Sequence, residues 1–269
     1  MKFSVFTLAF PGYTAEEAIE ISKRVGFDGV DIRVHRDGHI YIDASKERRK
    51  QLLEYAKSYE IEFFGIYSYI GRGFVSPNYK IRERELKELS AHIDLALDLE
   101  GIYVRIFPGT YERSEENMTR FIECCKRACS EAEDKGVYIG IETHGELVWN
   151  AETCNRVLEE VNSDNLKIVF DPANIFRLGL NPAKEGELIP KDSIIAIQFH
   201  DFKKLNDKLR YTLLGKGDVP IDDVIKLIKE VRFDGFIVVE YEKWWHPEEL
   251  PDPEIGLPHE LKYLKDKLL

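Results

Sequence analysis

The chain has 269 residues, of which 43% are hydrophobic and 32% are charged, and its formal net charge is −11 at pH 7. This composition is typical of a globular protein, and the acidic excess argues against a surface that binds a polyanion such as nucleic acid. No uncharged apolar run approaches the roughly 18 residues that a membrane helix needs, so a membrane partner is not expected.

Short runs rich in β-branched and aromatic residues alternate with longer amphipathic segments along the whole chain. The first run meets Pro11 and Gly12 early and has no small-residue cleavage pattern, so we interpret it as a strand and not as a signal peptide. The expected strands cover residues 3–10, 29–34, 61–70, 103–109, 138–144, 166–174, 194–202 and 235–242. The expected helices cover residues 14–27, 45–59, 81–99, 116–136, 151–162, 181–189, 221–233 and 259–269.

The two kinds of segment together predict a barrel. Near-continuous apolar strands with amphipathic helices between them are typical of a parallel sheet that is covered by helices. Eight such pairs in 269 residues give about 34 residues per unit, which fits a single (β/α)8 TIM barrel of about 250 residues. No linker divides the chain, so one domain is expected over 1–269. An open doubly wound sheet is disfavoured, because FPGYTAEE follows the first strand in place of G-x-G-x-x-G.

Two junctions between a helix and the next strand almost repeat, RVGFDG at 24–29 and EVRFDG at 230–235. A glycine at such a junction can adopt the left-handed conformation that ends a helix. The cysteines lack paired C-x-x-C spacing and crowd one helical segment, so we expect buried free thiols, as in a reducing cytoplasm. They are Cys124, Cys125, Cys129 and Cys154.

Charged or metal-binding side chains end four late strands of the expected barrel. They are Glu142, Asp171, His200 and Glu240, spaced by 29, 29 and 40 residues, which puts them at comparable depth at the functional face. A single carboxylate at such a position could equally cap the next helix. Three carboxylates in one barrel mouth repel one another unless a cation lies among them. Carboxylate oxygens with one imidazole suit a single divalent ion such as Mn²⁺, Mg²⁺, Co²⁺ or Zn²⁺.

The segment 165–175, NLKIVFDPANI, supports this interpretation. Asp171 stands at the end of its strand as a potential ligand. Pro172 follows at once and turns the chain out of the sheet, because proline has no N–H for the strand ladder.

These four residues, together with the motifs ETH, FDPAN, GKGDVP at 215–220 and VEYE, resemble the xylose isomerase-like TIM barrel superfamily of sugar phosphate isomerases and epimerases. The likeness extends over the whole chain and is specific in its last half. The resemblance implies that Glu142, Asp171, His200 and Glu240 bind one divalent metal ion. It also implies that Glu142 and Glu240 are the catalytic proton-transfer pair, with Asp171 and His200 as ligands only.

The chemistry implied is removal of a proton next to a carbonyl, through an enediolate, in a ketose or keto-sugar derivative. Return of the proton gives an epimer or an isomer. A metal-dependent dehydratase, acting on an inosose- or dehydroshikimate-like ring, is the alternative on the same scaffold. A barrel that binds sugar without catalysis is the third hypothesis, since fold does not imply function.

Two positions depart from the family pattern. Many members have a histidine where this chain has Asn174, and a His-x-Lys-Asp run where it reads His200-Asp201-Phe202-Lys203. The apurinic endonuclease branch binds three metal ions through extra histidines. Here the third and fourth strands end without histidine, at 67–69 and Phe107, and with the acidic charge this disfavours phosphodiester cleavage.

Further residues are candidates for substrate binding. His144 lies two residues after Glu142, on the same side of the strand, where it could contact substrate or orient Glu142. Asn174 could bond a hydroxyl group or cap a helix. Tyr67, Phe107 and Trp149 could wall a sugar pocket or belong to the core. Lys203 and Arg210, which follow the seventh strand, could meet a phosphate or a carboxylate.

The segment 243–254, KWWHPEELPDPE, is irregular and rich in proline. Its adjacent Trp244 and Trp245 present a large apolar surface, which requires either a lid role or a partner chain. The apolar surface leaves a homo-oligomer open. The resemblance to sugar isomerases implies a small-molecule sugar or polyol as substrate.

Overall fold

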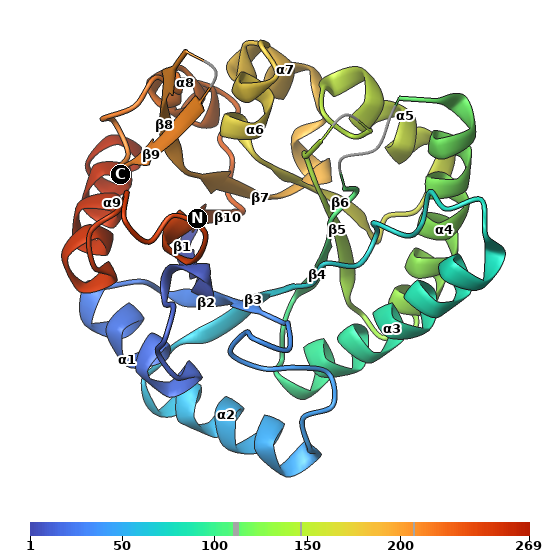
Figure 1. Cartoon of the computed structure of the whole chain (residues 1–269), viewed down its shortest axis with the longest axis horizontal. Helices are drawn as coiled ribbons and strands as arrows, with labels where there is room; N and C mark the ends of the chain where they lie inside the picture. The colour runs from blue at the N-terminus through green and yellow to red at the C-terminus, as the bar shows by residue number, and fades with distance from the viewer. Residues whose placement is uncertain (110–112, 146, 207) are drawn as a thin grey trace.

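The protein is a closed barrel of parallel strands surrounded by helices, as the sequence predicts (Figure 1). The computed structural model describes residues 1–109, 113–145, 147–206 and 208–269. Neighbouring strands follow the order β1-β10-β7-β6-β5-β4-β3-β2 around the barrel. These strands are β1 (Lys2–Phe6), β2 (Gly29–Arg33), β3 (Glu62–Tyr67), β4 (Tyr103–Ile106), β5 (Tyr138–Glu142), β6 (Leu166–Phe170), β7 (Ile194–Phe199) and β10 (Phe236–Val239).

Helices cover the outside of the barrel, and α9 packs between α8 and α1 to complete the ring. The helices are α1 (Ala15–Val25), α2 (Lys46–Ser58), α3 (Tyr79–Asp98), α4 (Glu115–Glu133), α5 (Ala151–Val161), α6 (Pro172–Arg177), α7 (Pro182–Leu188), α8 (Ile221–Glu230) and α9 (Pro253–Leu268). Short 3-10 turns are η1 (Thr7–Ala9), η2 (Lys191–Ser193) and η3 (Glu242–Trp244). None of the described helices is long and apolar enough to span a membrane.

Local sequence signals fix where the first helix begins and ends. Thr14 and Glu17 form a reciprocal capping box at the start of α1, and Gly26 ends this helix with a φ of 104°. The second copy of the junction has Arg232 in place of this glycine. Arg232 nevertheless adopts a φ of 51°, so the tertiary structure imposes the left-handed conformation even where the residue type disfavours it.

Two separate apolar clusters follow from the alternation of side chains along each strand. The larger one lies between the strands and the helices. The smaller one fills the inside of the barrel and includes Phe6, Tyr67, Tyr103, Val169 and Val238. The inside of the barrel is therefore a packed core and not a pore, as in other barrels of this kind, whose active sites lie at the carboxyl ends of the strands.

The packed interior also contains a buried polar network below the mouth. Asp31 is fully buried and accepts hydrogen bonds from Ser4 and, at 2.7 Å, from the hydroxyl group of Tyr103. The hydroxyl groups of Tyr103 and Tyr67 lie 3.3 Å apart. Burial raises the pKa of Asp31 to about 6, and the hydrogen bonds from Ser4 and Tyr103 oppose this rise.

Every barrel strand ends before the residue at which the sequence-based prediction ended it, and two of these ends bear on the site. We expected one strand over 194–202, but β7 ends at Phe199 and an antiparallel hairpin follows, β8 (Asp201–Leu205) and β9 (Lys208–Thr212). We also expected a strand over 166–174, but β6 ends at Phe170 and α6 begins at Pro172. Proline suits the first helical position because its φ is already fixed and its missing N–H is not needed there.

Candidate active site

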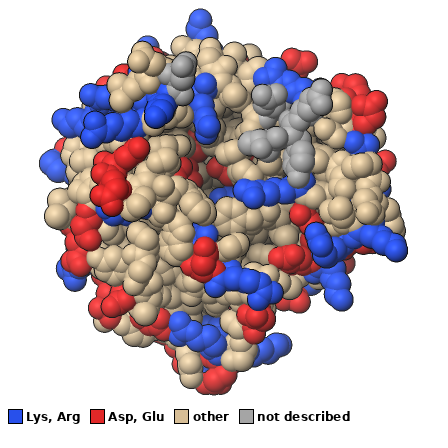
Figure 2. All heavy atoms as spheres, in the orientation of Figure 1, with Lys and Arg blue, Asp and Glu red and all other residues tan. Residues whose placement is uncertain are grey.

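A cavity of about 530 Å³ opens at the carboxyl ends of the barrel strands. Figure 2 shows this face of the molecule, with acidic side chains inside a central hollow and basic side chains on its rim. Five residues predicted from the sequence line the cavity: Phe107, Glu142, His144, Asn174 and Glu240. Its volume is in the range that small-molecule sites occupy.

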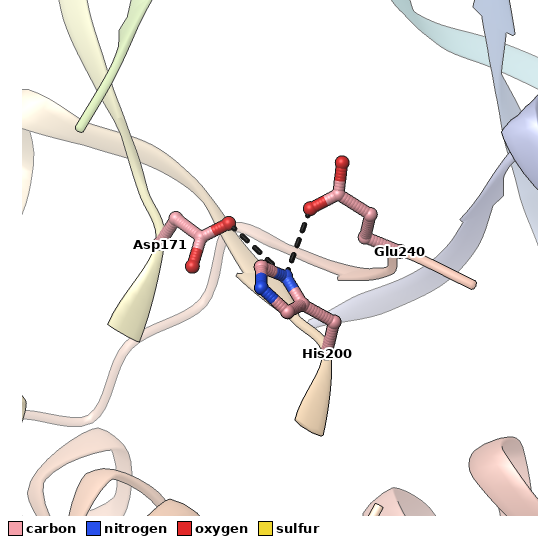
Figure 3. Close-up of side chains that lie close together, drawn as sticks. All are labelled: Asp171, His200 and Glu240. Atoms are coloured by element: carbon pink, nitrogen blue, oxygen red, sulfur yellow. Dashed lines mark ion pairs between the residues drawn. The ribbon is translucent and has the colours of Figure 1, made fainter. Parts of the chain in front are cut away.

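Three of the four predicted metal ligands converge beside this cavity (Figure 3). Asp171, His200 and Glu240 each offer an atom within 4.8 Å of the others, and all three are buried. Nδ1 of His200 lies 2.9 Å from Oε2 of Glu240 and 3.4 Å from Oδ2 of Asp171. The three side chains come from the ends of β6, β7 and β10, which are neighbours in the barrel.

The start of α6 orients Asp171. This residue is the N-cap of α6, and its Oδ1 accepts the backbone N–H of Asn174 at 2.9 Å. The hydrogen bond occupies one carboxylate oxygen and leaves Oδ2 directed at His200. Asp171 is thus both a helix cap and a member of the cluster, which combines the two interpretations that the sequence left open.

The cluster fits a divalent cation. Nδ1 of His200 is buried and has no hydrogen bond of acceptable geometry among the described residues, although two carboxylate oxygens approach it. Burial opposes protonation of this imidazole, but the charges of Asp171 and Glu240 outweigh burial and raise its pKa well above the usual value. The site therefore calls for positive charge, and a nitrogen with carboxylate oxygens is a donor set that Mn²⁺, Co²⁺ or Zn²⁺ accepts.

Glu142 lies next to this cluster at the end of β5 and is 2% exposed. Its Oε2 lies 3.5 Å from Nε of Arg105. Burial raises the pKa of Glu142 to about 8, and Glu240 and Asp171 add to this rise while Arg105 opposes it. Glu142 is not one of the three converging residues, so its role as a fourth ligand stays a prediction.

Gln198 joins the acidic residues into one network, and sequence reasoning missed it. Its amide nitrogen lies 2.6 Å from Oε2 of Glu240, 3.2 Å from Oε1 of Glu142 and 3.3 Å from Oδ2 of Asp171. A signal was present in the sequence, because Gln198 precedes His200 by two residues and a strand places such residues on the same face.

Three predicted substrate-binding residues lie where a substrate would contact them. The rings of Phe107 and His144 have centroids 4.2 Å apart and form one wall of the cavity with Asn174. Burial lowers the pKa of His144 to about 3, and Arg105 contributes to this shift. His144 is therefore a neutral imidazole, which can donate or accept a hydrogen bond to a hydroxyl group.

Four other predicted substrate contacts are not among the described residues that line the cavity, and their role in substrate binding stays a prediction. Tyr67 is completely buried inside the barrel, with the guanidinium of Arg105 4.7 Å from its ring. Trp149 lies in a separate cleft and stacks on Arg113 at 3.6 Å. Lys203 and Arg210 are exposed on the β8–β9 hairpin, because the chain leaves the barrel before it reaches them.

The side chains of Trp244 and Trp245 lie in different environments. Trp244 packs against the apolar cluster inside the barrel, and its ring lies 4.2 Å from the guanidinium of Arg33. Trp245 is 51% exposed and lines the cavity. Arg33 is buried and also approaches Asp37 at 2.8 Å, so it anchors the segment that carries both rings. A partner chain for this segment remains a prediction.

Several further residues line the cavity without having been predicted as site residues. They are Arg72, Arg177, Tyr211, Glu242 and His246. Arg72 and His246 lie in loops, and Arg177, Tyr211 and Glu242 lie in short elements outside the barrel strands, where no periodic pattern indicates which side chains point inward. The ring of Tyr211 stacks on His246 at 4.0 Å and thereby joins the hairpin to the segment after β10.

Sequence comparison finds a family of proteins with the same architecture. The model of the family described as xylose isomerase-like TIM barrel matches residues 11–267. An uncharacterised protein of Methanocaldococcus jannaschii is 26% identical over 251 residues, which cover 89% of this chain and 83% of that protein. An inosose dehydratase of Clostridium perfringens is 23% identical over 182 residues, which cover 60% of this chain and 59% of the dehydratase.

Solved structures show the same fold. An IolI protein with a bound zinc atom has a TM-score of 0.84 at 18% identity, covering 100% of this chain and 98% of that chain. A D-tagatose 3-epimerase-like protein has a TM-score of 0.82 at 23% identity, with the same coverage of both chains. At this level of identity the likeness establishes the fold alone, and the activities of these proteins are not transferred to this chain.

Proposed function

The chain belongs to the xylose isomerase-like TIM barrel family, and on this basis we propose that it is a divalent-metal-dependent enzyme acting on a small sugar or polyol derivative. The reaction begins with removal of a proton next to a carbonyl group and leads to isomerisation or epimerisation. One observation carries this proposal. Glu142 and Glu240 both line one cavity, and they come from β5 and β10, which stand on either side of β6 and β7, the strands of Asp171 and His200, in the barrel order.

Asp171, His200 and Glu240 would hold the metal ion, with Glu142 as the fourth ligand. The bound cation would polarise the substrate carbonyl and stabilise the negative charge that develops when the proton leaves. Gln198 keeps the carboxylates close together by donating its amide to them. Asp171, His200 and Glu240 are buried, and burial strengthens these electrostatic interactions.

Glu142 and Glu240 are the two groups that transfer protons to and from the substrate. One carboxylate removes it from the carbon next to the carbonyl, and the other acid returns a proton from its own side of the substrate. Return to the same carbon inverts that centre and gives an epimer, whereas return to the neighbouring carbon converts ketose to aldose. His144, which is neutral, hydrogen-bonds a hydroxyl group of the substrate and fixes which carbon faces the carboxylates.

A dehydratase is the second candidate, and the similarity to an inosose dehydratase supports it. Both reactions share the first step. In the dehydratase, the enolate expels a hydroxyl group from the next carbon with the help of an acid. The products are an unsaturated ketone and water.

Solvent-deuterium exchange followed by nuclear magnetic resonance distinguishes these reactions. The protein reconstituted with Mn²⁺ is incubated in D₂O with ketohexoses, inosose and 3-dehydroshikimate. We expect deuterium next to the carbonyl of one substrate without loss of water. Loss of water from that substrate would establish the dehydratase instead. Metal-loaded protein that exchanges no proton in any of these compounds would contradict enzymatic proton transfer on them.

Variants then test the two glutamates. Glu142→Gln and Glu240→Gln should each lower the exchange rate by about 100-fold or more, since each removes one partner of the proton transfer. Glu62→Gln is the control, because Glu62 is exposed at the start of β3, at the other end of the barrel. Full exchange activity in Glu142→Gln would contradict its assignment as a catalytic residue.

A further inference from the structure

Two arginines on the rim of the cavity have no ion pair with any residue that the structure describes. Arg177 ends α6, a short distance along the chain from Asp171, and lines the cavity. Arg72 follows β3 and lines the cavity as well, with its guanidinium 4.8 Å from the ring of Phe107. Among the residues that the structure describes, neither guanidinium has a carboxylate partner, and both side chains are exposed to solvent.

The freedom of these two arginines contrasts with the other arginines near the barrel mouth. Arg105 lies beside Glu142 and donates to the carbonyl oxygen of Ser68 at 2.7 Å, and Arg33 is held by Asp37 and the tryptophans. Acidic partners are plentiful, because the chain has 49 acidic and 38 basic residues. Two exposed arginines that have no such partner among the described residues are available for a ligand.

The two guanidinium groups belong to the same wall of the cavity. Arg72 lies over Phe107, whose ring contacts His144. Arg177 and His144 line this same cavity. The cluster of Asp171, His200 and Glu240 adjoins the same cavity, which Glu240 lines. A substrate with its reacting carbons at the cluster would therefore extend toward the two arginines.

We propose that the substrate carries an oxyanionic group, a carboxylate or a phosphate, which Arg72 and Arg177 bind at the rim of the cavity. This inference rests on the proposed function and specifies its substrate class. Guanidinium groups present paired N–H donors that match an oxyanion, and neutral hydroxyl groups do not require such charge. The exposed cations Lys203, Lys208 and Arg210 on the nearby hairpin favour the approach of an anion.

The inference is tested by isothermal titration calorimetry with two simple anions, inorganic phosphate and glycerate. Metal-free and Mn²⁺-reconstituted samples of the full chain are titrated in parallel, and elemental analysis gives the metal content of each. We expect that Arg72→Gln/Arg177→Gln weakens binding of the preferred anion by about 10-fold or more, since two charge-assisted contacts are lost. Metal content should not change. Tighter binding of phosphate would indicate a phosphorylated substrate, and tighter binding of glycerate a sugar acid.

Two controls keep the result interpretable. Arg84→Gln removes an exposed arginine on α3, far from the cavity lining, and should bind both anions like the wild type. The single variants Arg72→Gln and Arg177→Gln should each weaken binding, so a folding defect of the double variant does not leave the question open.

The outcomes separate this inference from the proposed function. Anion affinity that is equal in the double variant and the wild type, or wild-type protein that binds neither anion, would overturn the anionic substrate, whatever the metal content. One metal ion per chain in the same samples would then leave the proposed function standing. Anion binding that depends on Arg72 and Arg177, in protein that takes up no metal ion, would support the anionic substrate and contradict the metal-dependent function.

Discussion

The side-chain amide of Gln198 donates to Oε2 of Glu240 at 2.6 Å, and the same nitrogen also faces Glu142 and Asp171. A neutral amide with two hydrogens thus stands among three buried carboxylates. This amide, the guanidinium of Arg105 and the proton that His200 binds each reduce the repulsion between the carboxylates. The consequences for stability, metal binding and activity can each be measured.

Gln198→Leu should destabilise the protein most when no metal is bound. The substitution removes the donor shared by the carboxylates, which costs about 1–3 kcal/mol for an unsatisfied buried group. A bound cation would compensate for much of this loss. Thermal unfolding with and without chelator measures the difference, and Gln51→Leu on the exposed face of α2 is the control. An equal loss of stability in both conditions would contradict the role assigned to the amide.

His200→Ala should abolish stoichiometric metal binding. The imidazole supplies the nitrogen ligand of the converging group, and its loss leaves only carboxylates. Elemental mass spectrometry on chelator-free protein should give about one Mn, Co, Zn or Mg per wild-type chain and a small fraction of that in the variant. Metal binding should also raise the wild-type free energy of unfolding by about 2.7 kcal/mol at 100 times the dissociation constant. Equal metal content in both proteins would remove His200 from the ligand set.

The two tryptophans should respond differently to truncation. Trp244→Ala removes a ring that packs on the barrel interior and on Arg33, so we expect a loss on the order of 2–3 kcal/mol in the free energy of unfolding. Trp245→Ala removes a half-exposed ring from the cavity wall. It should raise KM while the unfolding temperature stays unchanged. Calorimetry and steady-state kinetics on both variants test the division, and a reversed pattern would refute it.

Gly217→Ala should destabilise the loop that follows the hairpin. Asp201 accepts the backbone N–H groups of Gly215, Gly217 and Val219, and a methyl group on Gly217 would overlap with Oδ1 of Asp201. We expect a loss of about 1–3 kcal/mol, as in other overpacked sites. Urea unfolding measures it. Lys216→Ala changes an exposed residue of the same loop and should leave the free energy of unfolding unchanged. Equal effects of the two substitutions would contradict the close contact between Gly217 and Asp201.

Stability should fall as pH rises from about 4.5 to about 8 because of Glu260. Burial raises the pKa of this carboxyl to about 8, and Asp201 adds to the rise. The unfolded chain holds this proton less tightly, so unfolding releases a proton inside that range and becomes easier as pH increases. Each unit of pKa is worth about 1.4 kcal/mol.

Glu260→Gln should therefore be more stable than the wild type at pH 8, and the difference should shrink toward pH 5. Denaturant unfolding at several pH values measures it, with Glu248→Gln on the surface as the control. A constant difference across this pH range would show that Glu260 does not titrate as described.

The sequence predicted the barrel because its signals are local and repeated. Apolar strands and amphipathic helices alternate with a constant period, and this period reports burial in a parallel sheet. The same regularity placed Glu142, Asp171, His200 and Glu240 at equivalent strand ends. The structure brings Asp171, His200 and Glu240 together, and Glu142 lies in the same cavity.

Residues outside that regular pattern could not be placed in the same way. The hairpin after β7 and the start of α6 depend on where each strand leaves the barrel, and this is decided by contacts with neighbouring strands. Tyr67 and Phe107 both stand near strand ends, yet one is sealed beneath Arg105 and the other lines the cavity.

The amino-acid sequence by itself determined the architecture and the acidic and imidazole side chains that the barrel mouth would contain. Only the tertiary structure decided that Gln198 would link three carboxylates and that Arg72 and Arg177 would share a wall of the cavity. The physical reason is that periodicity records which face of an element is buried. The distance between side chains on different elements depends on how strands tilt and loops fold across the barrel, and no local pattern encodes that distance.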